Sequence, residues 1–272
     1  MMDDLDQQLH ELSRFSRLKW ITDTILHQGA VTVEDLCEQL NVSRMTIHRD
    51  LDELERQGIL RKVRGGATAQ RSALFESDIR YRSRSEMREK EAIARLDLKY
   101  VEPGQAIMMD DSTTTVALAH LLKDIKPLTL ITNCMGIMNE MIGVEDLRLI
   151  ALGGEYIPHY NAFGGIICER SVEVVRANVL FMSTSAINGE LAFHQEENVV
   201  KVKQAMLASA TKRILMLDHT KVGKVALHLL APLKEFDIII FDEGVDREYV
   251  HTLQNAGIQV EIAPYQNSQS GV

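Results

Sequence analysis

A stretch near the amino end combines guanidinium, hydroxyl and imidazole groups at the spacing of one helix face. It covers residues 41–67 and reads NVSRMTIHRDLDELERQGILRKVRGGA. Its apolar residues recur at roughly helical spacing and predict a buried face made of Val42, Ile47, Leu51 and Leu54. Polar side chains early in this helix then face away from the core, where a recognition helix meets bases and phosphates. We therefore predict DNA contacts from Ser43, Arg44, Thr46, His48 and Arg49, and Ser43 can also cap the helix.

The second half of this stretch predicts a short hairpin that carries further positive charge. Gly58 is expected to end the helix, residues 59–63 to form a strand, and Gly65-Gly66 to make a tight turn. We therefore add Arg61, Arg64 and Gly65 to the predicted DNA contacts. The alternative is a surface amphipathic helix that is followed by a hairpin and contacts no DNA.

The net charge of -9 at first argues against a nucleic-acid partner. Between residues 41 and 71, however, arginine and lysine outnumber aspartate and glutamate. Such a local excess of positive charge allows phosphate contact if the cations share one face. The acidic remainder of the chain therefore does not exclude double-stranded DNA as a partner.

A second group of chemically active residues is the run from Asp110 to Thr115, which reads DDSTTT and precedes a helical pattern over residues 116–122. A helix N-terminus offers free N–H groups and a positive dipole end to an anion, and hydroxyls add donors for phosphate oxygens. The run fits a Ser/Thr-rich helix cap equally well. On the ligand-binding interpretation, the site residues here are Asp110, Asp111, Ser112, Thr113 and Thr114.

Further polar residues follow other apolar runs of the chain. The cluster Asp218-His219-Thr220-Lys221 either binds a polyol phosphate or only caps and orders its loop. Lys203 lies on a predicted helix, where it either reaches a phosphate or carboxylate or belongs to a solvated face. The predicted ligand-binding residues therefore also include Thr132, Asn133, Gly153, Gly154, Ser183, Lys203, Asp218 and Lys221.

Two kinds of domain must position these groups. Helical patterns over residues 16–27 and 33–40, with the recognition helix and the hairpin, predict a winged helix-turn-helix over residues 13–68. Apolar runs then predict strands near residues 106–109, 128–131, 147–152, 179–182, 213–217, 237–241 and 258–262. Near-continuous apolar strands imply a mostly parallel, doubly wound sheet that binds ligands outside the carboxyl ends of its strands. The predicted fold class is therefore α/β, with a linker over residues 69–89 and a ligand-binding domain over residues 90–265.

Composition narrows the remaining possibilities. No apolar run approaches the roughly 20 residues that span a bilayer. The acidic, polar start is unlike a secretory signal, so we expect a cytoplasmic protein without a membrane partner. Cys37, Cys134 and Cys168 are far apart and form no CxxC pair, which favours reduced thiols over disulfides or a structural zinc site. We expect no metal and no cofactor.

The segment from Arg17 to Ala67 closely resembles the N-terminal signature of the DeoR family of bacterial transcription regulators. The family pattern is matched by Ser43, Thr46-Ile47, Arg49-Asp50-Leu51, Leu54, Gly58 and Gly65-Gly66-Ala67. The chain departs from this pattern at His48, where Arg is common, and at Arg64, where His is common. Both replacements keep a polar side chain that can contact DNA, so they bear on the operator sequence.

The segment from Glu86 to Asp242 is similar to the effector domain of that family, which is related to sugar-phosphate isomerases and binds phosphorylated sugars or similar metabolites. The matching positions are Asp110, Thr113-Thr114-Thr115, Thr132-Asn133, Gly153-Gly154, Lys203 and Asp218-His219-Lys221-Gly223. The resemblance implies that the hydroxyl run and Lys203 hold the phosphate end of the effector. The departures are Ser112 for a usual Gly, His194 for a common Thr, and Ser183-Thr184-Ser185-Ala186 for a Gly-Ala-Asp-Gly run.

These observations predict a sequence-specific DNA-binding repressor of a carbohydrate-metabolism operon, controlled by a small phosphorylated metabolite. Because helix-turn-helix proteins usually read two-fold operators, we expect a homo-oligomer, either a dimer or a tetramer. The alternative is a sugar-phosphate isomerase or deaminase with an appended DNA-binding head. Such an enzyme needs a positioned general base, for which the candidates by type are Asp110, Asp111, Asp218 and His219. The sequence offers no convincing acid–base pair among them, so we predict no catalytic residues and no enzyme.

Overall fold

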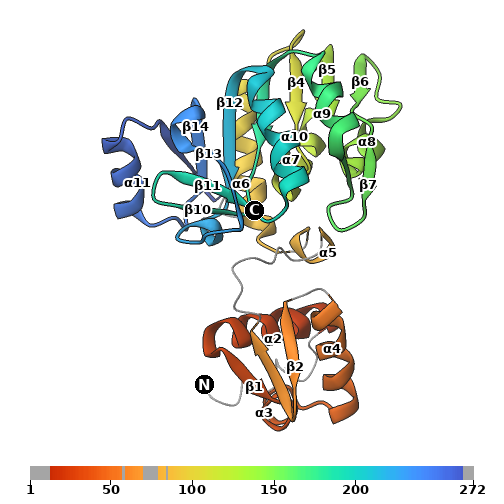
Figure 1. Ribbon diagram of the computed structural model, residues 1–272, viewed down its shortest axis with the longest axis vertical. Helices are drawn as coiled ribbons and strands as arrows, with labels where there is room; N and C mark the ends of the chain where they lie inside the picture. The colour runs from red at the N-terminus through yellow and green to blue at the C-terminus, as the bar shows by residue number, and fades with distance from the viewer. Residues whose placement is uncertain (1–12, 57–58, 70–78, 84, 266–272) are drawn as a thin grey trace, which may run out of the picture. The chain divides into compact units, whose positions relative to one another are not determined.

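The computed structural model describes residues 13–56, 59–69, 79–83 and 85–265. The chain divides into two compact units, residues 1–78 and 79–272 (Figure 1). The expected helix stop at Gly58 and residues 70–78 of the expected linker lie outside the described residues. Each unit has a fold of its own.

The first unit combines helices with a small antiparallel sheet. Its helices are α2 (Arg14–Gln28), α3 (Val33–Leu40) and α4 (Arg44–Arg56). Its strands, in sheet order, are β1 (Ala30–Thr32), β3 (Gly66–Ala69) and β2 (Leu60–Val63). This arrangement confirms the predicted winged helix-turn-helix, in which β2 and β3 form the wing. Strand β1 adds a third strand to the expected two, because its residues pair with β3 from Ala30 to Thr32.

Local signals explain where these helices start and stop. The backbone N–H of Asp35 donates to the Thr32 hydroxyl at 3.0 Å, so Thr32 caps α3. The N–H of Thr46 likewise donates to Ser43 at 3.2 Å at the start of α4. Gly29 ends α2 in the left-handed conformation with φ 82°. The core is formed by fully buried apolar residues, including Ile21, Ile25, Leu36, Leu40, Ile47, Leu51, Leu54 and Leu60.

One expected core position of α4 is wrong. Val42 precedes the helix and is only half-buried, whereas Asp50 takes a buried place on the helix. The helix begins at Arg44, so the buried face runs through Ile47, Asp50, Leu51 and Leu54 instead.

The second unit is built on a seven-stranded sheet in which every neighbouring pair is parallel. In sheet order the strands are β15 (Val260–Ala263), β14 (Ile238–Asp242), β12 (Ala210–Leu217), β9 (Ala177–Met182), β4 (Ala106–Met109), β5 (Leu128–Thr132) and β6 (Leu147–Ala151). All seven predicted strands exist within a few residues of their expected bounds. The prediction of a parallel α/β domain is therefore confirmed.

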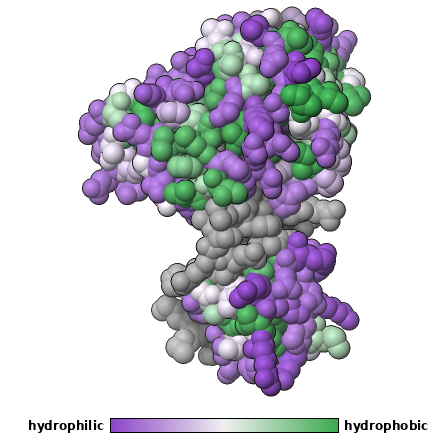
Figure 2. Space-filling view, viewed as in Figure 1, coloured by the Kyte–Doolittle hydropathy of each residue, from purple (hydrophilic) through white to green (hydrophobic). Residues whose placement is uncertain are grey.

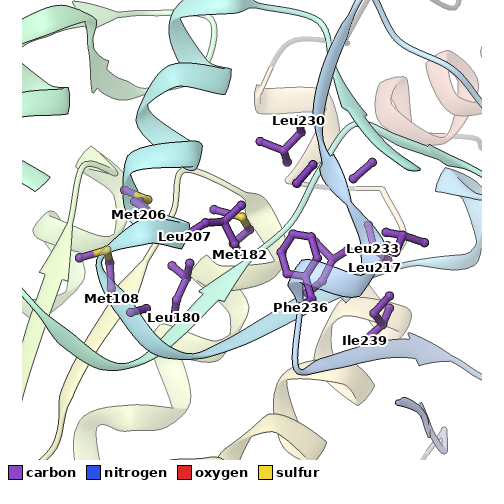
Figure 3. Packing of buried hydrophobic residues seen from close by; sticks show 14 of the residues in the cluster. Met108, Leu180, Met182, Met206, Leu207, Leu217, Leu230, Leu233, Phe236 and Ile239 are labelled. Atoms are coloured by element: carbon purple, nitrogen blue, oxygen red, sulfur yellow. The ribbon is translucent and has the colours of Figure 1, made fainter. Parts of the chain in front are cut away.

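Helices cover both faces of this sheet, as a doubly wound fold requires. One hydrophobic cluster joins the strands to α6 (Met87–Asp97), α7 (Thr113–Leu121) and α8 (Met135–Met141). The cluster on the other face includes side chains of α9 (Gly165–Glu173), α10 (Glu197–Ala208) and α11 (Arg247–Asn255). Figure 3 shows part of this second cluster, where Met206 and Leu207 of α10 lie beside the strand residues Met108 and Met182.

Smaller elements complete the second unit. Two antiparallel sheets consist of β7 (Glu155–Ile157) with β8 (Ala162–Gly164), and of β10 (Ala186–Asn188), β11 (Leu191–His194) and β13 (His228–Pro232). The short helices are α5 (Ile79–Arg82), η1 (Leu98–Tyr100), η2 (Leu122–Asp124), η3 (His219–Lys221) and η4 (Leu233–Glu235). Helix α5 lies inside the range that the sequence suggests for the linker, and it belongs to the second unit.

The strand order reverses between β4 and β9. The chain runs from β4 outward to β5 and β6, then returns to the other side of β4 with β9 and continues outward to β12, β14 and β15. In open parallel sheets the ligand crevice lies at such a reversal, outside the carboxyl ends of the strands. Asp110 follows β4 and Ser183 follows β9, so this reversal brings two predicted site residues together.

Within the described ranges no helix is long and apolar enough to cross a membrane. No group of three potential metal ligands is found among the same residues.

Candidate DNA-contacting surface and ligand site

Helix α4 presents a polar, exposed face opposite its buried residues. Arg44, His48 and Arg49 are exposed, and Thr46 is half-buried beside Ser43 at the start of the helix. In Figure 2 the surface of the first unit is mainly hydrophilic over the side where Figure 1 places α4. Because side chains of a helix tilt toward its N-terminus, these residues project from the end that enters a DNA groove in helix-turn-helix proteins.

Ion pairs divide the cations of this unit into two groups. Arg44 pairs with Glu34, Arg56 pairs with Glu53, and Lys62 pairs with Asp52. Among the described residues, the side chains of Arg49, Arg61 and Arg64 make no ion pair or hydrogen bond. These three exposed guanidinium groups are therefore available to phosphates or bases at no cost in internal contacts.

A buried ion pair supports α4 from behind. Arg17 of α2 donates to Asp50 through Nε at 2.5 Å and through Nη2 at 3.2 Å. The Asp50 side chain is only 2% exposed, and a buried charge without a partner is strongly destabilising. The neighbouring residues Arg49 and Asp50 therefore differ in role. Arg49 is exposed to solvent, and Asp50 joins α4 to α2 through its ion pair with Arg17.

The two glycines of the wing turn serve the backbone. Gly65 has φ +81°, a conformation that favours glycine, and its carbonyl accepts from the N–H of Val33 at 2.9 Å. A Cβ atom on Gly66 would lie 2.1 Å from the carbonyl oxygen of Val31. Only glycine therefore allows β3 to approach β1, while the exposed position of Gly65 keeps it on the predicted DNA-facing turn.

Asp110 is the centre of the site at the reversal of the strand order. Its Oδ2 accepts a hydrogen bond from Lys203 and another from the N–H of Ser183 at 2.8 Å. Its Oδ1 accepts from the N–H of Ser112 and from the Thr115 hydroxyl, both at 3.0 Å. The carboxylate is fully buried and holds together β4, α7, β9 and α10.

Lys203 is neutralised from two sides. Its Nζ also lies 3.0 Å from Oδ1 of Asp111 and donates to the carbonyl of Ser183 at 3.2 Å. Burial alone would lower the pKa of Lys203, but the carboxylates of Asp110 and Asp111 outweigh burial and raise it. Burial would likewise raise the pKa of Asp111, but Lys203, with smaller contributions from His194 and Arg82, lowers it. Asp111 and Lys203 are therefore charged, and the carboxyl groups of Asp110 and Asp111 both face the one ammonium.

The hydroxyl run after β4 divides between capping and potential ligand contacts. Ser112 accepts from the N–H of Thr115 at 3.1 Å and caps α7, and the Thr115 hydroxyl bonds to Asp110. Among the described residues, the hydroxyls of Thr113 and Thr114 make no hydrogen bond. The capping interpretation therefore describes Ser112, whereas Thr113 and Thr114 keep donors and acceptors for a ligand.

A second charged cluster surrounds Asp218, which follows β12. Asp218 accepts from the N–H of Thr220 at 3.1 Å and caps η3. Burial lowers the pKa of Lys90 to about 8, an effect that Asp218 opposes and that Lys221 strengthens. Burial also lowers the pKa of Lys224, again with a contribution from Lys221. Positive charge therefore exceeds negative charge here, and an anion bound among these lysines would restore the balance.

Other predicted site residues are occupied by the fold. The Thr132 hydroxyl accepts from the N–H of Cys134 at 3.0 Å, and the Asn133 side chain donates to the carbonyl of Phe163 at 2.8 Å. A Cβ on Gly154 would lie 2.4 Å from the carbonyl oxygen of Gly164, so this glycine allows close packing of β8. Gly153 has open space around its Cα and is compatible with a ligand.

Several groups at the site were not predicted from sequence. Four of these groups interact electrostatically with Asp111 or Asp218, namely Arg82, Lys90, Lys224 and the imidazole of His194. Arg82 and Lys90 lie in or beside a charge-rich stretch that resembles a solvated linker. His219 is predicted as part of the cluster after β12 and as a candidate base, and its Nδ1 lies 2.9 Å from Oδ2 of Asp242. No local signal marks these residues, because their partners come from distant strands.

Comparison with known proteins gives the same division of the chain. Residues 17–73 match the DeoR-like helix-turn-helix domain, and residues 85–243 match the DeoR C terminal sensor domain. The regulator YgbI of Escherichia coli K12, described as an uncharacterized HTH-type transcriptional regulator, is 30% identical over 91% of this chain and 97% of its own. The lactose phosphotransferase system repressor of Staphylococcus epidermidis is 30% identical over 86% of this chain and 94% of its own.

Two further similarities have lower identity. The putative aga operon transcriptional repressor of Escherichia coli O157:H7 is 29% identical over 90% of this chain and 92% of its own. A solved D-ribose-5-phosphate isomerase in complex with phospho-erythronic acid has 14% identity and a TM-score of 0.37, over 49% of this chain and 52% of that chain.

Proposed function

This chain belongs to the DeoR family of transcriptional regulators, and from this premise we propose how it represses a carbohydrate-metabolism operon. Helix α4 and the turn between β2 and β3 bind double-stranded operator DNA. A phosphorylated sugar or a related metabolite binds the second unit and changes the affinity for that DNA. The prediction of a regulator rather than an enzyme is confirmed by the family.

The observation that carries the effector proposal is the distribution of charge in the second unit. At the reversal of the strand order, two carboxylates face the single ammonium of Lys203. Around Asp218, by contrast, the ammonium groups of Lys90, Lys221 and Lys224 outnumber the nearby carboxylates. One end of the site therefore suits hydroxyl donors, and the other suits an anion.

We infer from this distribution how the effector is oriented. A phosphate beside Lys203 would meet two buried carboxylates, which repel it at short range in a poorly solvated place. The phosphate fits better among Lys90, Lys221 and Lys224, and the sugar hydroxyls donate to Asp111. This assignment differs from the expectation that Lys203 holds the phosphate. Thr113 and Thr114 remain available to either end of the ligand.

The names of two relatives support a carbohydrate operon as the target. One is named as a repressor of a lactose phosphotransferase system and another as a putative repressor of an aga operon. These names describe those proteins, and they make sugar phosphates the first ligands to test on this one. A regulator that binds operator DNA must reach the chromosome, which supports a cytoplasmic location.

Two-fold operators support a dimer or a tetramer. Exposed aliphatic side chains on β11, on β13 and in the segment before β13 offer an apolar surface for such contacts, namely Leu191, Val225, Leu227 and Leu229. Gel filtration of the intact chain at micromolar concentration should give a species larger than a monomer. A monomer under these conditions would contradict this part of the proposal.

The DNA-binding proposal is tested by selecting binding sites for the intact chain from a pool of randomised duplexes. Affinity for the selected duplex is then measured by fluorescence anisotropy. Arg49→Ala should lose about 1–3 kcal/mol of binding free energy, because its guanidinium is exposed and has no internal partner. Arg56→Ala is the matched control, since Arg56 ends the same helix and pairs with Glu53. Equal affinities for the wild type and Arg49→Ala would remove α4 from the proposed interface.

The effector proposal is tested by thermal unfolding of the intact chain with a panel of hexose and pentose phosphates. A ligand should raise Tm, and the matching unphosphorylated sugar should raise it less. Lys221→Met should remove the difference between the two, because it removes one cation of the anion-binding end. If no phosphorylated compound stabilises the wild type, the proposed site is wrong.

A further inference from the structure

Helix α5 is the first described element of the second unit and follows directly on residues 70–78, which lead from the first unit. A helix of four residues has almost no stability of its own, because nucleation costs more than so few hydrogen bonds return. Its position therefore depends on contacts with the rest of the second unit. Whatever changes those contacts changes how the chain leaves the second unit toward the DNA-binding unit.

Three contacts hold α5 in place. The N–H of Ile79 donates to the carbonyl of His159 at 3.2 Å. The guanidinium of Arg82 lies 5.3 Å from the centre of the Tyr160 ring, within the range of a cation–π contact. The Nζ of Lys90 donates to the carbonyl of Arg82 at 2.5 Å and to the carbonyl of Ser85 at 2.6 Å. Lys90 thus holds the carboxyl end of α5 against α6.

The same lysine lies on α6, which packs against β12, and Asp218 at the anion-binding end of the proposed site directly follows β12. Asp218 and Lys221 both act on the charge of Lys90, which is 6% exposed. An ammonium group has three N–H donors, and the two carbonyls use two of them. Among the described residues no other hydrogen bond of the Lys90 ammonium is found, so its third donor remains for a ligand. One side chain therefore touches both the linker helix and the ligand site.

Arg82 provides a second connection between α5 and the ligand site. Its positive charge lowers the pKa of Asp111, after the larger effects of burial, Lys203 and His194. Helix α5 consequently carries a buried cation, Arg82, that interacts electrostatically with Asp111 at the hydroxyl-binding end of the site. Lys90 interacts in the same way with Asp218 at the anion-binding end.

We propose that Lys90 couples effector binding to the linker helix, by holding the last residue of α5 with one N–H group, Ser85 of the following turn with a second, and the anionic group of the effector with the third. The proposal rests on the function proposed above. A bound anion compensates the buried ammonium and fixes it, so α5 is held more firmly to the second unit when the effector is present. The effector binds one state of the protein, with α5 held, more tightly than the other, with α5 released. The difference between these two binding free energies sets the coupling to DNA binding.

Hydrogen–deuterium exchange of the intact chain tests this coupling, with inorganic phosphate as the probe and chloride at equal ionic strength as the reference. Phosphate should raise Tm and slow exchange several-fold in the peptide that contains α5. Lys90→Met should abolish the slower exchange. Lys90→Gln should do the same while keeping two N–H donors for the carbonyls, so it separates the loss of charge from a loss of folding. The matched control is Lys201→Met, because Lys201 lies on the surface of α10 and pairs with Glu197.

The outcomes separate the inference from the function on which it rests. Slower exchange in the wild type and in Lys201→Met, but not in the Lys90 variants, supports the coupling. A rise in Tm without slower exchange in α5 overturns the coupling and leaves the phosphate site intact. Slower exchange that persists in the Lys90 variants also overturns it. If phosphate changes neither Tm nor exchange in the wild type, the proposed phosphate site fails and the coupling fails with it.

Discussion

The DNA-binding unit keeps its available cations on the surface, whereas the sensor unit buries two cations of its candidate ligand site, Lys90 and Lys203. Among the described residues, Arg49, Arg61 and Arg64 are exposed and have no internal partner. Lys203 is 3% exposed and lies between two carboxylates, and Lys90 is bonded to two carbonyls. DNA phosphates approach from solvent, so a cation that binds them can stay hydrated on the surface, without the free-energy cost of burying a charge. A small effector is enclosed instead, so its charged partners must be buried beforehand and balanced by one another.

This difference predicts where substitutions act. A change at the exposed cations should alter DNA affinity and leave stability unchanged, whereas a change inside the sensor unit should alter stability first. The single tryptophan, Trp20, lies on α2, so its fluorescence follows unfolding of the DNA-binding unit separately. Circular dichroism follows both units, and the two signals together show which unit a substitution affects.

The largest loss of stability is expected from Asp110→Asn. An amide in place of Oδ2 would point N–H groups at Lys203 and at the N–H of Ser183, which both donate to this oxygen. The sensor unit should lose about 3–5 kcal/mol of unfolding free energy, as when one partner of a buried ion pair is removed. Thermal unfolding by circular dichroism measures the loss, and the Trp20 signal should not move.

Asp111→Asn is the matched control for this prediction. Asp111 also lies 3.0 Å from Lys203, yet no backbone N–H is found donating to its side chain among the described residues. It should therefore cost less stability than Asp110→Asn and lower the affinity for sugar phosphates more clearly. Equal losses for the two variants would contradict the central role of Asp110.

A smaller loss, confined to the other unit, is expected from Arg17→Met. The change leaves the buried carboxylate of Asp50 without its bidentate partner, although Nε of Arg14 lies 3.9 Å away and can partly replace it. The DNA-binding unit should lose about 1–3 kcal/mol, as when a buried acceptor is left unsatisfied. Trp20 fluorescence in urea measures this loss. Arg56→Met removes an exposed pair and should leave the same transition unchanged.

The same contrast explains how much the sequence could predict. The cap at Ser43, the spacing of Ile47, Leu51 and Leu54, and the glycine turn all lie within a few residues of one another, so α4 and the wing were predictable. The strands were predictable too, because each is a continuous apolar run. The pairing of Asp110 with Ser183 and Lys203 was not, since these residues are 73 and 93 positions apart and meet only through the strand order.

Residue type alone does not show that two charged side chains are buried. Asp50 counts as one more anion in the sequence, and only the structure shows that it is buried against Arg17. Lys90 directly follows the predicted linker over residues 69–89, in a stretch rich in charge and serine, yet it is buried, bonds to the carbonyls of Arg82 and Ser85, and has its pKa affected by Asp218. In both cases a distant partner decides whether a charged side chain is exposed or enclosed.

A gain in stability is expected from Asp97→Asn, at a buried acid outside the ligand site. Within the described part of the chain, neither oxygen of Asp97 makes a hydrogen bond, and burial, followed by the charge of Glu261, raises its pKa well above 3.8. Between 3.8 and the raised value the folded chain binds one more proton than the unfolded chain, so stability falls as pH rises through this window. The amide should add about 1 kcal/mol or more at neutral pH, because one unit of pKa corresponds to about 1.4 kcal/mol.

Thermal unfolding at a series of pH values measures this effect. The difference in Tm between Asp97→Asn and the wild type should grow from acidic to neutral pH. Asp124→Asn, at an exposed position on η2, is the control and should show no such trend. A difference that stays constant with pH would mean that Asp97 is ionised in the folded chain.

The smallest effect is expected on the exposed side of the comparison, from Glu34→Gln. Arg44 is 69% exposed and pairs with Glu34, which is 60% exposed, so the pair itself stabilises the fold by less than about 1 kcal/mol. Without the carboxylate, Arg44 is free to contact DNA as Arg49 is, and one negative charge leaves the interface. Affinity for the selected duplex should rise by less than about 1 kcal/mol, and its dependence on the logarithm of salt concentration should steepen by about one unit. The control is Glu53→Gln, which frees Arg56 at the far end of α4 and should change neither the affinity nor its salt dependence. An equal gain in affinity from both variants would show that the lost negative charge, rather than the position of Arg44, is responsible.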